Sequence, residues 1–183
     1  MQIAKLSIEG AWIARSPVLT DNRGCFREWF RLEEVSSALG RSFIVKQANM
    51  SSSKRGVVRG IHYSLINEGQ SKWVTCVSGL IWDVIVDLRP NSPTFKSWEG
   101  IYLSASSGDS LFISEGLGHG FVSLEENSEV VYLLTSPYSP SHEFEIHPLD
   151  PDIGIEWPIS DITLSNKDSA APSFRAQLES GKL

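Results

Sequence analysis

Three side chains with acid–base and anion-binding chemistry lie close together in the segment RGIHYSLINEGQSK, residues 59–72. Arg59 precedes His62 by three residues, and Lys72 closes the segment. Histidine titrates near neutral pH and is the usual general base, whereas arginine and lysine bind and stabilise anions. The segment therefore indicates an acid–base enzyme that acts on a phosphorylated substrate.

Several residues elsewhere have side chains that can complete such a site. Asp83, Asp87 and Asp168 are all candidates to orient His62. Tyr132 lies in an apolar run, where an aromatic residue fills a core or acts as a proton donor. His62 also has an ordinary explanation, because a single histidine on a strand is more often a hydrogen-bonded core residue than a catalytic base. The residues alone leave both explanations open.

Two glycine-led segments have the spacing of the paired motifs of cupins, a superfamily of jelly-roll proteins that often bind metals. A metal-binding cupin carries a second histidine two residues after the first, but Ser64 stands two residues after His62. Glu68 and His119 remain as possible ligands, and affinity falls as ligands are lost. We therefore predict no metal, and keep a metal-dependent enzyme that uses His62, Glu68 and His119 as an alternative.

Composition narrows the class of protein. The chain has 183 residues and a formal net charge of -6, which argues against a nucleic acid polymer as partner. No run approaches the roughly 18 apolar residues of a membrane span. Two cysteines are too few for a disulfide framework, and the start of the chain lacks the apolar region of a signal peptide. We expect a cytoplasmic protein without membrane contact.

Short apolar or alternating runs separated by turn residues predict an all-β fold. Helix patterns are limited to residues 31–40, which end at Gly40, and to 173–181 in the tail. We predict a single domain over 1–183, a cupin-like double-stranded β-helix (jelly roll) with short flanking helices, which residues 140–183 wrap as a tail. The strands are expected at 43–50, 56–63, 73–77, 80–88, 101–104, 111–114, 120–124 and 129–135.

The order of motifs along nearly the whole chain resembles the dTDP-4-dehydrorhamnose 3,5-epimerase family. The motifs are DNRGCFREWF, QANMSSSKRGVVRGIHY, GQSKWVTCVSGLIWDVIVDLRPNSPTF, EGLGHGF, VVYLLTSPYSP, DPDIGIEWP and LSNKD. The resemblance implies a jelly-roll homodimer that needs no cofactor and epimerises a dTDP-4-keto-6-deoxyhexose at C3, C5 or both.

The resemblance also implies roles for single residues. His62 matches the base that removes a proton next to the 4-keto group, and Asp168 matches its orienting partner. Lys72 matches the lysine that faces the keto oxygen, and Tyr132 the acid on the opposite face. The role of Asp83 stays open. The positions that match substrate-binding residues are Arg23, Glu28, Gln47, Asn49, Arg59, His119, Glu143 and Lys167, with Tyr138 as the aromatic residue that stacks on thymine.

The chain departs from the double-epimerase pattern in two places. Residues 133–137 read LLTSP where a lysine and another polar or aromatic residue are more usual, and 146–149 read IHPL in place of a tryptophan–asparagine segment. Both departures resemble the branch that makes antibiotic sugars. A C3-only or C5-only epimerase therefore remains an alternative, as does a non-catalytic module that binds a nucleotide sugar.

Overall fold

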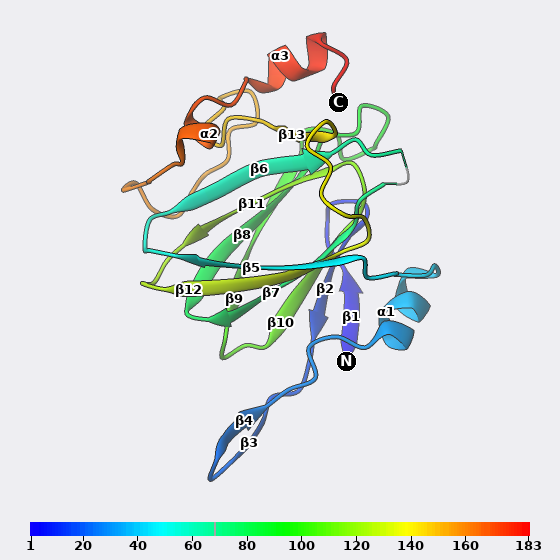
Figure 1. Cartoon of the computed structure of the whole chain (residues 1–183), viewed down its shortest axis with the longest axis vertical. Coiled ribbons are helices and arrows are strands. Elements are labelled where there is room, and N and C mark those ends of the chain that lie inside the picture. The colour runs from blue at the N-terminus through cyan, green and yellow to red at the C-terminus, as the bar shows by residue number, and fades with distance from the viewer. Residues whose placement is uncertain (68) are drawn as a thin grey trace.

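Two antiparallel sheets packed face to face form the body of the protein, in a computed structural model that describes residues 1–67 and 69–183. The fold is the expected all-β, cupin-like jelly roll (Figure 1). The six-stranded sheet has the order β1 (Gln2–Lys5), β2 (Ala11–Arg15), β10 (Asp109–Ile113), β7 (Lys72–Ser78), β12 (Ser128–Leu134), β5 (Gln47–Ser53). The five-stranded sheet has the order β13 (Glu143–Glu145), β6 (Val58–Ser64), β11 (Leu117–Ser123), β8 (Leu80–Asp87), β9 (Trp98–Ser104).

Alternating side chains decide which face of each strand is internal. On β8, Ile81 and Ile85 enter the core between the sheets, while Trp82 and Val84 pack on the opposite face. Asp83 follows the inward period, so a carboxylate points into the barrel. The same period brings polar side chains of neighbouring strands to one end of the interior.

All eight predicted strands are present, with ends that shift by a few residues. The largest error is at residues 43–46, which precede β5 and are not a strand. Phe43 is instead buried in the cluster beneath the first helix, where its N–H donates to Ser36 Oγ. Strand patterning missed the short or exposed elements β1, β2, β13 and the hairpin of β3 (Leu19–Asp21) and β4 (Gly24–Phe26).

The predicted helices are also present. The first, α1 (Leu32–Leu39), ends at Gly40, whose φ of 66° is the left-handed conformation expected of a helix-terminating glycine. Val35 anchors α1 on the outer face of the six-stranded sheet, against Trp73 and Phe112. The tail helix α3 (Phe174–Glu179) matches 173–181, and a one-turn helix, α2 (Asn166–Ser169), was not predicted.

The chain after residue 140 runs along the outer face of the five-stranded sheet (Figure 1). Ile146, Ile153 and Phe174 are buried there against the outward side chains of β6 and β8. The tail thereby brings α2 close to β6. No helix of the described residues has the length and apolar character needed to cross a membrane.

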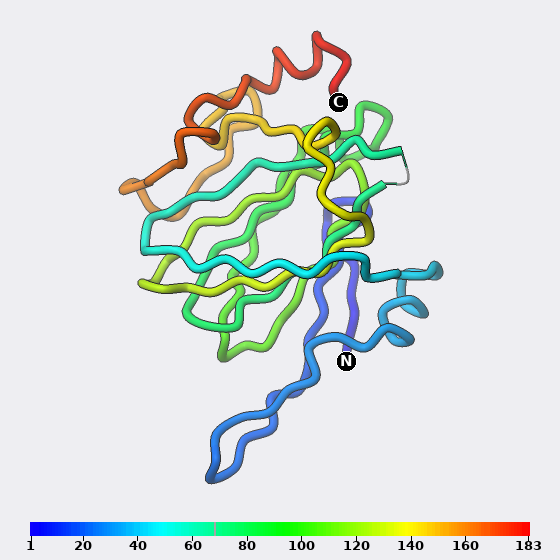
Figure 2. The backbone as a smooth tube through the Cα atoms, in the orientation of Figure 1, coloured from blue at the N-terminus to red at the C-terminus, as the bar shows by residue number. Residues whose placement is uncertain are grey.

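The β3–β4 hairpin projects from the barrel, at the end of the molecule opposite the C-terminus (Figure 2). Leu19 and Phe26 are 62% and 69% exposed on it. Two large apolar side chains with this exposure are available for contact with another molecule.

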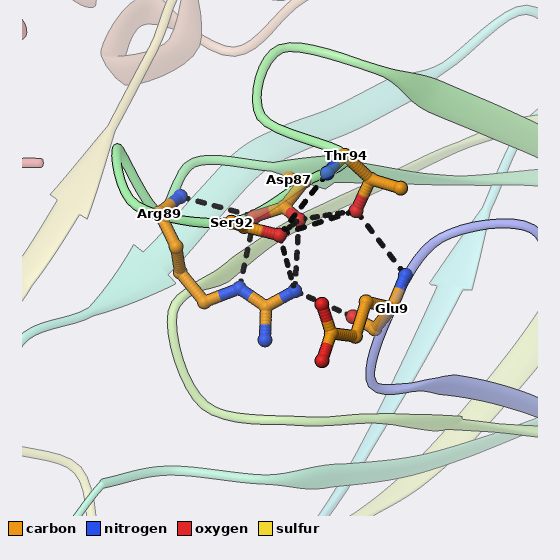
Figure 3. Close-up of polar contacts among 5 residues, drawn as sticks. All are labelled: Glu9, Asp87, Arg89, Ser92 and Thr94. Carbon is orange, nitrogen blue, oxygen red and sulfur yellow. Dashed lines mark hydrogen bonds and ion pairs between the residues drawn. The ribbon is translucent and has the colours of Figure 1, made fainter.

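A group of hydrogen bonds fixes the connection between β8 and β9 (Figure 3). The buried carboxylate of Asp87 accepts hydrogen bonds from Arg89, Ser92 and Thr94. Arg89 also donates to the carbonyl of Glu9, in the turn between β1 and β2. The group ties two turns together at one end of the barrel.

Candidate active site

A pocket of about 150 Å³ opens at one end of the barrel interior. Strands of both sheets, the β12–β13 loop and α2 contribute to its wall. The lining residues are Gln47, Asn49, His62, Gln70, Lys72, Tyr132, Leu134, Tyr138, Glu143, Phe144 and Lys167. Most of the residues predicted for the site therefore lie together.

His62 and Asp168 form a direct pair at the pocket. His62 Nε2 lies 2.7 Å from Asp168 Oδ1, and the His62 side chain is 38% exposed. The one-turn helix α2 holds Asp168, whose N–H is capped by Ser165 Oγ. Burial alone raises the pKa of Asp168, but the hydrogen bonds with His62 and Ser165 outweigh burial and lower this pKa below its ordinary value. Asp168 is thus a carboxylate that can orient the imidazole and stabilise its charged form.

Lys72 lies at the buried end of the pocket. Its side chain is 9% exposed, and Nζ donates to the carbonyl of His62 at 3.3 Å. Burial lowers the pKa of Lys72 to about 8, while the charges of Glu143 and Asp83 act in the opposite direction. A lysine in this setting is a concentrated positive charge that little water screens.

Tyr132 brings a phenol to the same pocket. On β12 it lies opposite Val74 of β7 and Asn49 of β5, with its ring against the apolar core. An imidazole, an ammonium group and a phenol hydroxyl therefore line one pocket. This combination supports proton removal, stabilisation of an oxyanion and proton return.

Hydrogen bonds hold the loop that carries Tyr138. Its N–H donates to Gln47 Oε1 at 2.7 Å, and Gln47 Nε2 donates to Asn49 Oδ1 at 2.9 Å. Tyr138 is 61% exposed and lines the pocket. Lys167 pairs with Glu145 at 3.1 Å. The open side of the pocket thus presents an aromatic ring and a lysine.

A second histidine–aspartate pair lies deeper in the barrel. His119 Nε2 is 2.8 Å from Asp83 Oδ2, and both side chains are buried. Burial raises the pKa of Asp83, although His119 and Lys72 act to lower it. Of the three aspartates considered for His62, only Asp168 contacts it, since Asp83 pairs with His119 and Asp87 with Arg89.

Four residues with a predicted substrate role do not line the pocket. Arg23 is exposed on the hairpin and pairs with Asp21, and Glu28 pairs with Arg31. Arg59 is an exposed residue of β6, and its guanidinium donates to Ser53 Oγ and the Ser52 carbonyl. The fourth is the buried His119. The substrate role of these residues stays a prediction.

The prediction missed three residues that line the pocket: Gln70, Leu134 and Phe144. Leu134 lies two residues after Tyr132 on one strand, so the alternation of side chains points both inward. Gln70 lies within the segment 59–72, but the sequence pattern alone does not indicate that its side chain lines the pocket. Phe144 lies on a three-residue strand, for which sequence periodicity gives no signal.

The metal-dependent alternative required Glu68, which lies outside the described residues. In 1–67 and 69–183, no three His, Cys, Asp or Glu residues form a group that could hold a metal ion. His62 and His119 each contact their own aspartate.

Fold and pocket together define the class: a cupin-like jelly-roll protein whose pocket brings together a histidine, a lysine and a tyrosine. The chain belongs to the dTDP-4-dehydrorhamnose 3,5-epimerase family, whose model matches residues 5–176. It is therefore an isomerase. A curated relative, the dTDP-4-dehydrorhamnose 3,5-epimerase of Mycolicibacterium smegmatis, is 43% identical over 184 residues, covering 100% of this chain and 90% of the relative.

Two solved structures extend the comparison. A 4-keto-6-deoxy sugar epimerase from the novobiocin biosynthetic gene cluster of Streptomyces spheroides is 41% identical with a TM-score of 0.97, covering 100% of this chain and 92% of that one. A 3′-monoepimerase of Streptomyces bikiniensis in complex with dTDP-quinovose is 43% identical with a TM-score of 0.93, covering 97% and 90%. These relatives favour an epimerase over a metal-dependent oxygenase or a non-catalytic binding module.

Proposed function

We propose that the protein epimerises a dTDP-4-keto-6-deoxyhexose at C3, C5 or both, without a cofactor. The observation that carries this proposal is the convergence of His62, Lys72 and Tyr132 in one pocket. Membership of the epimerase family supports the reaction class. Similarity to a monoepimerase that binds dTDP-quinovose supports a dTDP-linked sugar as ligand.

The reaction follows from the acidity of a hydrogen next to a ketone. His62 removes this proton, and Asp168 holds the imidazole and stabilises its positive charge. The electrons move onto the 4-keto oxygen, where the Lys72 ammonium stabilises the enolate; a preorganised donor of this kind contributes about 3 kcal/mol. Tyr132 donates a proton to the opposite face of the carbon, which inverts its configuration. General acid and base groups each contribute roughly 10² to 10⁴ in rate.

The remaining site residues bind the substrate in this proposal. Tyr138 stacks on the thymine ring, and Arg23 and Arg59 bind the diphosphate, because guanidinium groups match phosphate oxygens. The other substrate-binding positions are Glu28, Gln47, Asn49, His119, Glu143 and Lys167.

A homodimer accounts for the position of Arg23. Ligand pockets usually measure about 300 to 1,000 Å³, so a pocket of about 150 Å³ encloses only part of a ligand. Residues from outside this copy would have to enclose the rest. The hairpin with Arg23 projects away from its own barrel, and exposed Leu19 and Phe26 give it an apolar surface. We infer that the hairpin and Glu28 of one copy complete the site of a second copy. Sedimentation of the protein, and of a Leu19→Asp/Phe26→Asp variant, tests this assembly.

We also propose that residues 1–183 work as a single jelly-roll domain in the cytoplasm. Asp168 comes from the tail after residue 140, so the tail is part of the site and not a separate unit. Cys25 and Cys76 are free thiols, as a reducing compartment favours.

Solvent deuterium incorporation tests the proposed reaction. Incubation with dTDP-4-keto-6-deoxyglucose in D₂O should place deuterium at C3, C5 or both, and mass spectrometry with NMR reads the positions. Label at one carbon identifies a single-position epimerase, for which similarity to a monoepimerase gives a specific reason. Folded protein that binds the keto sugar but leaves both carbons unlabelled would contradict the proposal.

A further inference from the structure

Gln70 links two parts of the pocket wall through its side-chain amide. It is 7% exposed and immediately precedes the strand that begins with Lys72. Its Nε2 donates to Ser136 Oγ and to Glu143 Oε1, both at 3.1 Å. A primary amide nitrogen carries two hydrogens, so both donors of Gln70 are used. The two acceptors flank the β12–β13 loop that carries Tyr138.

Glu143 depends on this contact. Within 1–67 and 69–183, Gln70 is the one hydrogen-bond donor to the Glu143 carboxylate. The residue lies on β13, a three-residue edge strand that pairs only with β6. Because β13 lies at the edge of its sheet and the Gln70 amide donates the hydrogen bond to this carboxylate, we infer that Gln70 is the main restraint on its direction.

The type of residue at position 70 suits a neighbouring cation. A lysine or arginine there would pair with Glu143 and weaken its attraction for Lys72. A leucine would leave Glu143 without a donor, and a glutamate would repel it. Glutamine supplies hydrogen bonds without charge, so the full negative charge of Glu143 remains available to Lys72.

Two carboxylates compensate the positive charge of Lys72. Glu143 from β13 and Asp83 from β8 act on it, and Asp83 is also engaged by His119 from β11. Nζ of Lys72 also donates to the carbonyl of His62. The other polar or charged residues of the pocket are Gln47, Asn49, His62, Gln70, Tyr132, Tyr138 and Lys167, none of which is a carboxylate. A carboxylate that turned away would leave Asp83 as the main partner of a buried ammonium.

We propose that Gln70 is a positioning residue, which holds the Glu143 carboxylate toward Lys72 and so keeps the ammonium charged for catalysis. The use of this charge in catalysis rests on the proposed function. The position of the charge does not, because it is a property of the ligand-free protein. Gln70 acts through Glu143 and needs no contact with the reacting atoms.

NMR titration of the Lys72 side chain in the full chain without substrate tests the proposal. The ¹³Cε signal, assigned with a Lys72→Arg variant, should titrate near pH 8 in the unaltered protein. In Gln70→Leu the midpoint should fall by about half a pH unit or more, because Glu143 no longer offsets the burial of Lys72. Gln70→Met serves as a second variant of similar volume if the leucine variant does not fold.

Gln177→Leu is the matched control. Gln177 is a glutamine of similar burial, 5% exposed, whose Nε2 donates to the carbonyl of Glu145 on the same strand as Glu143. Its loss loosens β13 without freeing the Glu143 carboxylate, so the Lys72 midpoint should stay in place. Equal midpoints in all three proteins, or an equal fall in both variants, would overturn the proposal.

Kinetics separate this inference from the proposed function. If the keto sugar is a substrate, Gln70→Leu should lower kcat about 3- to 10-fold at pH 8, with a smaller change in KM and a smaller loss at pH 6.5, where the ammonium persists. A pH-independent loss would contradict the role of Gln70. Absence of any turnover would contradict the function alone, and the NMR titration would still decide the position of the charge.

Discussion

The two histidine–aspartate pairs have almost the same contact distance and very different surroundings. His62 and Asp168 are separated by 2.7 Å, and His119 and Asp83 by 2.8 Å. His62 and His119 even lie opposite each other in the register of β6 and β11. However, the side chain of His62 is 38% exposed and that of His119 is 10% exposed. Access to a substrate, and not the hydrogen bond, separates the candidate base from the buried pair.

The origin of the two aspartates differs as well. Asp83 is 36 residues from His119 and comes from the adjacent strand, so the sheet itself builds that pair. Asp168 is 106 residues from His62 and comes from a one-turn helix in the tail. The pair of His119 and Asp83 is part of the barrel, whereas the pair of His62 and Asp168 forms only when the tail docks. We therefore expect the pair of His119 and Asp83 to contribute mainly to stability and the pair of His62 and Asp168 mainly to catalysis.

Replacement of His62 by alanine should have the largest effect on activity. Loss of the base should lower deuterium incorporation about 10³-fold, whereas His119→Ala should lower it far less because His119 is buried and does not line the pocket. Exchange rates and KM values of both variants measure the contrast. An equal loss of exchange in the two variants would remove the distinction between the pairs.

Replacement of Asp83 by alanine should have the largest effect on stability. It leaves the buried Lys72 and His119 without their shared carboxylate, and breaking a buried ionic pair typically costs about 3 kcal/mol or more. Urea unfolding of Asp83→Ala and Asp168→Ala gives the comparison. We expect the smaller loss for Asp168→Ala, and a reversed order would show that tail docking stabilises the fold more than the buried pair.

Replacement of Asp168 by asparagine tests the pair with His62 and keeps the side-chain volume nearly unchanged. The uncharged amide no longer stabilises the charged imidazole, so exchange should fall about 10²-fold. The cap from Ser165 Oγ to the N–H of residue 168 uses only the backbone and should persist. Circular dichroism and unfolding should therefore be nearly unchanged, and an exchange rate equal to that of the unaltered protein would exclude an electrostatic role.

The three aspartates also mark the limit of sequence interpretation. Asp83 and Asp87 lie on one alternating strand, and the pattern predicted this β-strand correctly. The pattern did not predict their partners, because these depend on register and on turns. The pairing of Asp168 with His62 came only from family resemblance, since helix α2 is four residues long and gives no periodic signal.

The hairpin shows a second limit. Family resemblance assigned Arg23 to the substrate, but it did not indicate that the hairpin with Arg23 projects away from its own barrel. Position relative to the barrel depends on tertiary packing, and any contact with a second copy depends on assembly. Strand existence was predictable because seven-residue strands repeat the alternation several times, whereas three-residue strands do not.

Asp87, the third aspartate, should make the stability of the fold depend on pH. Burial alone would raise the pKa of Asp87, but hydrogen bonds from Arg89, Ser92 and Thr94 outweigh burial and lower it to about 2 (Figure 3). Because this pKa is below the ordinary 3.8, its stabilisation is present above about pH 4 and is lost as pH falls through 2. Asp87→Asn should therefore cost about 2 kcal/mol at pH 7 and weaken the loss of stability between pH 4 and 2.

Asp109→Asn provides the control for this acid response. Burial raises the pKa of Asp109, so this group gains a proton more readily in the folded state and opposes acid unfolding. Its replacement should leave the steep loss of stability below pH 4 in place or increase it. Urea unfolding at pH 7, 4, 3 and 2 measures both variants. If Asp87→Asn were to lose stability with acid as steeply as the unaltered protein, the Arg89, Ser92 and Thr94 contacts would not be what holds Asp87 ionised, and the group in Figure 3 would owe its stability to packing.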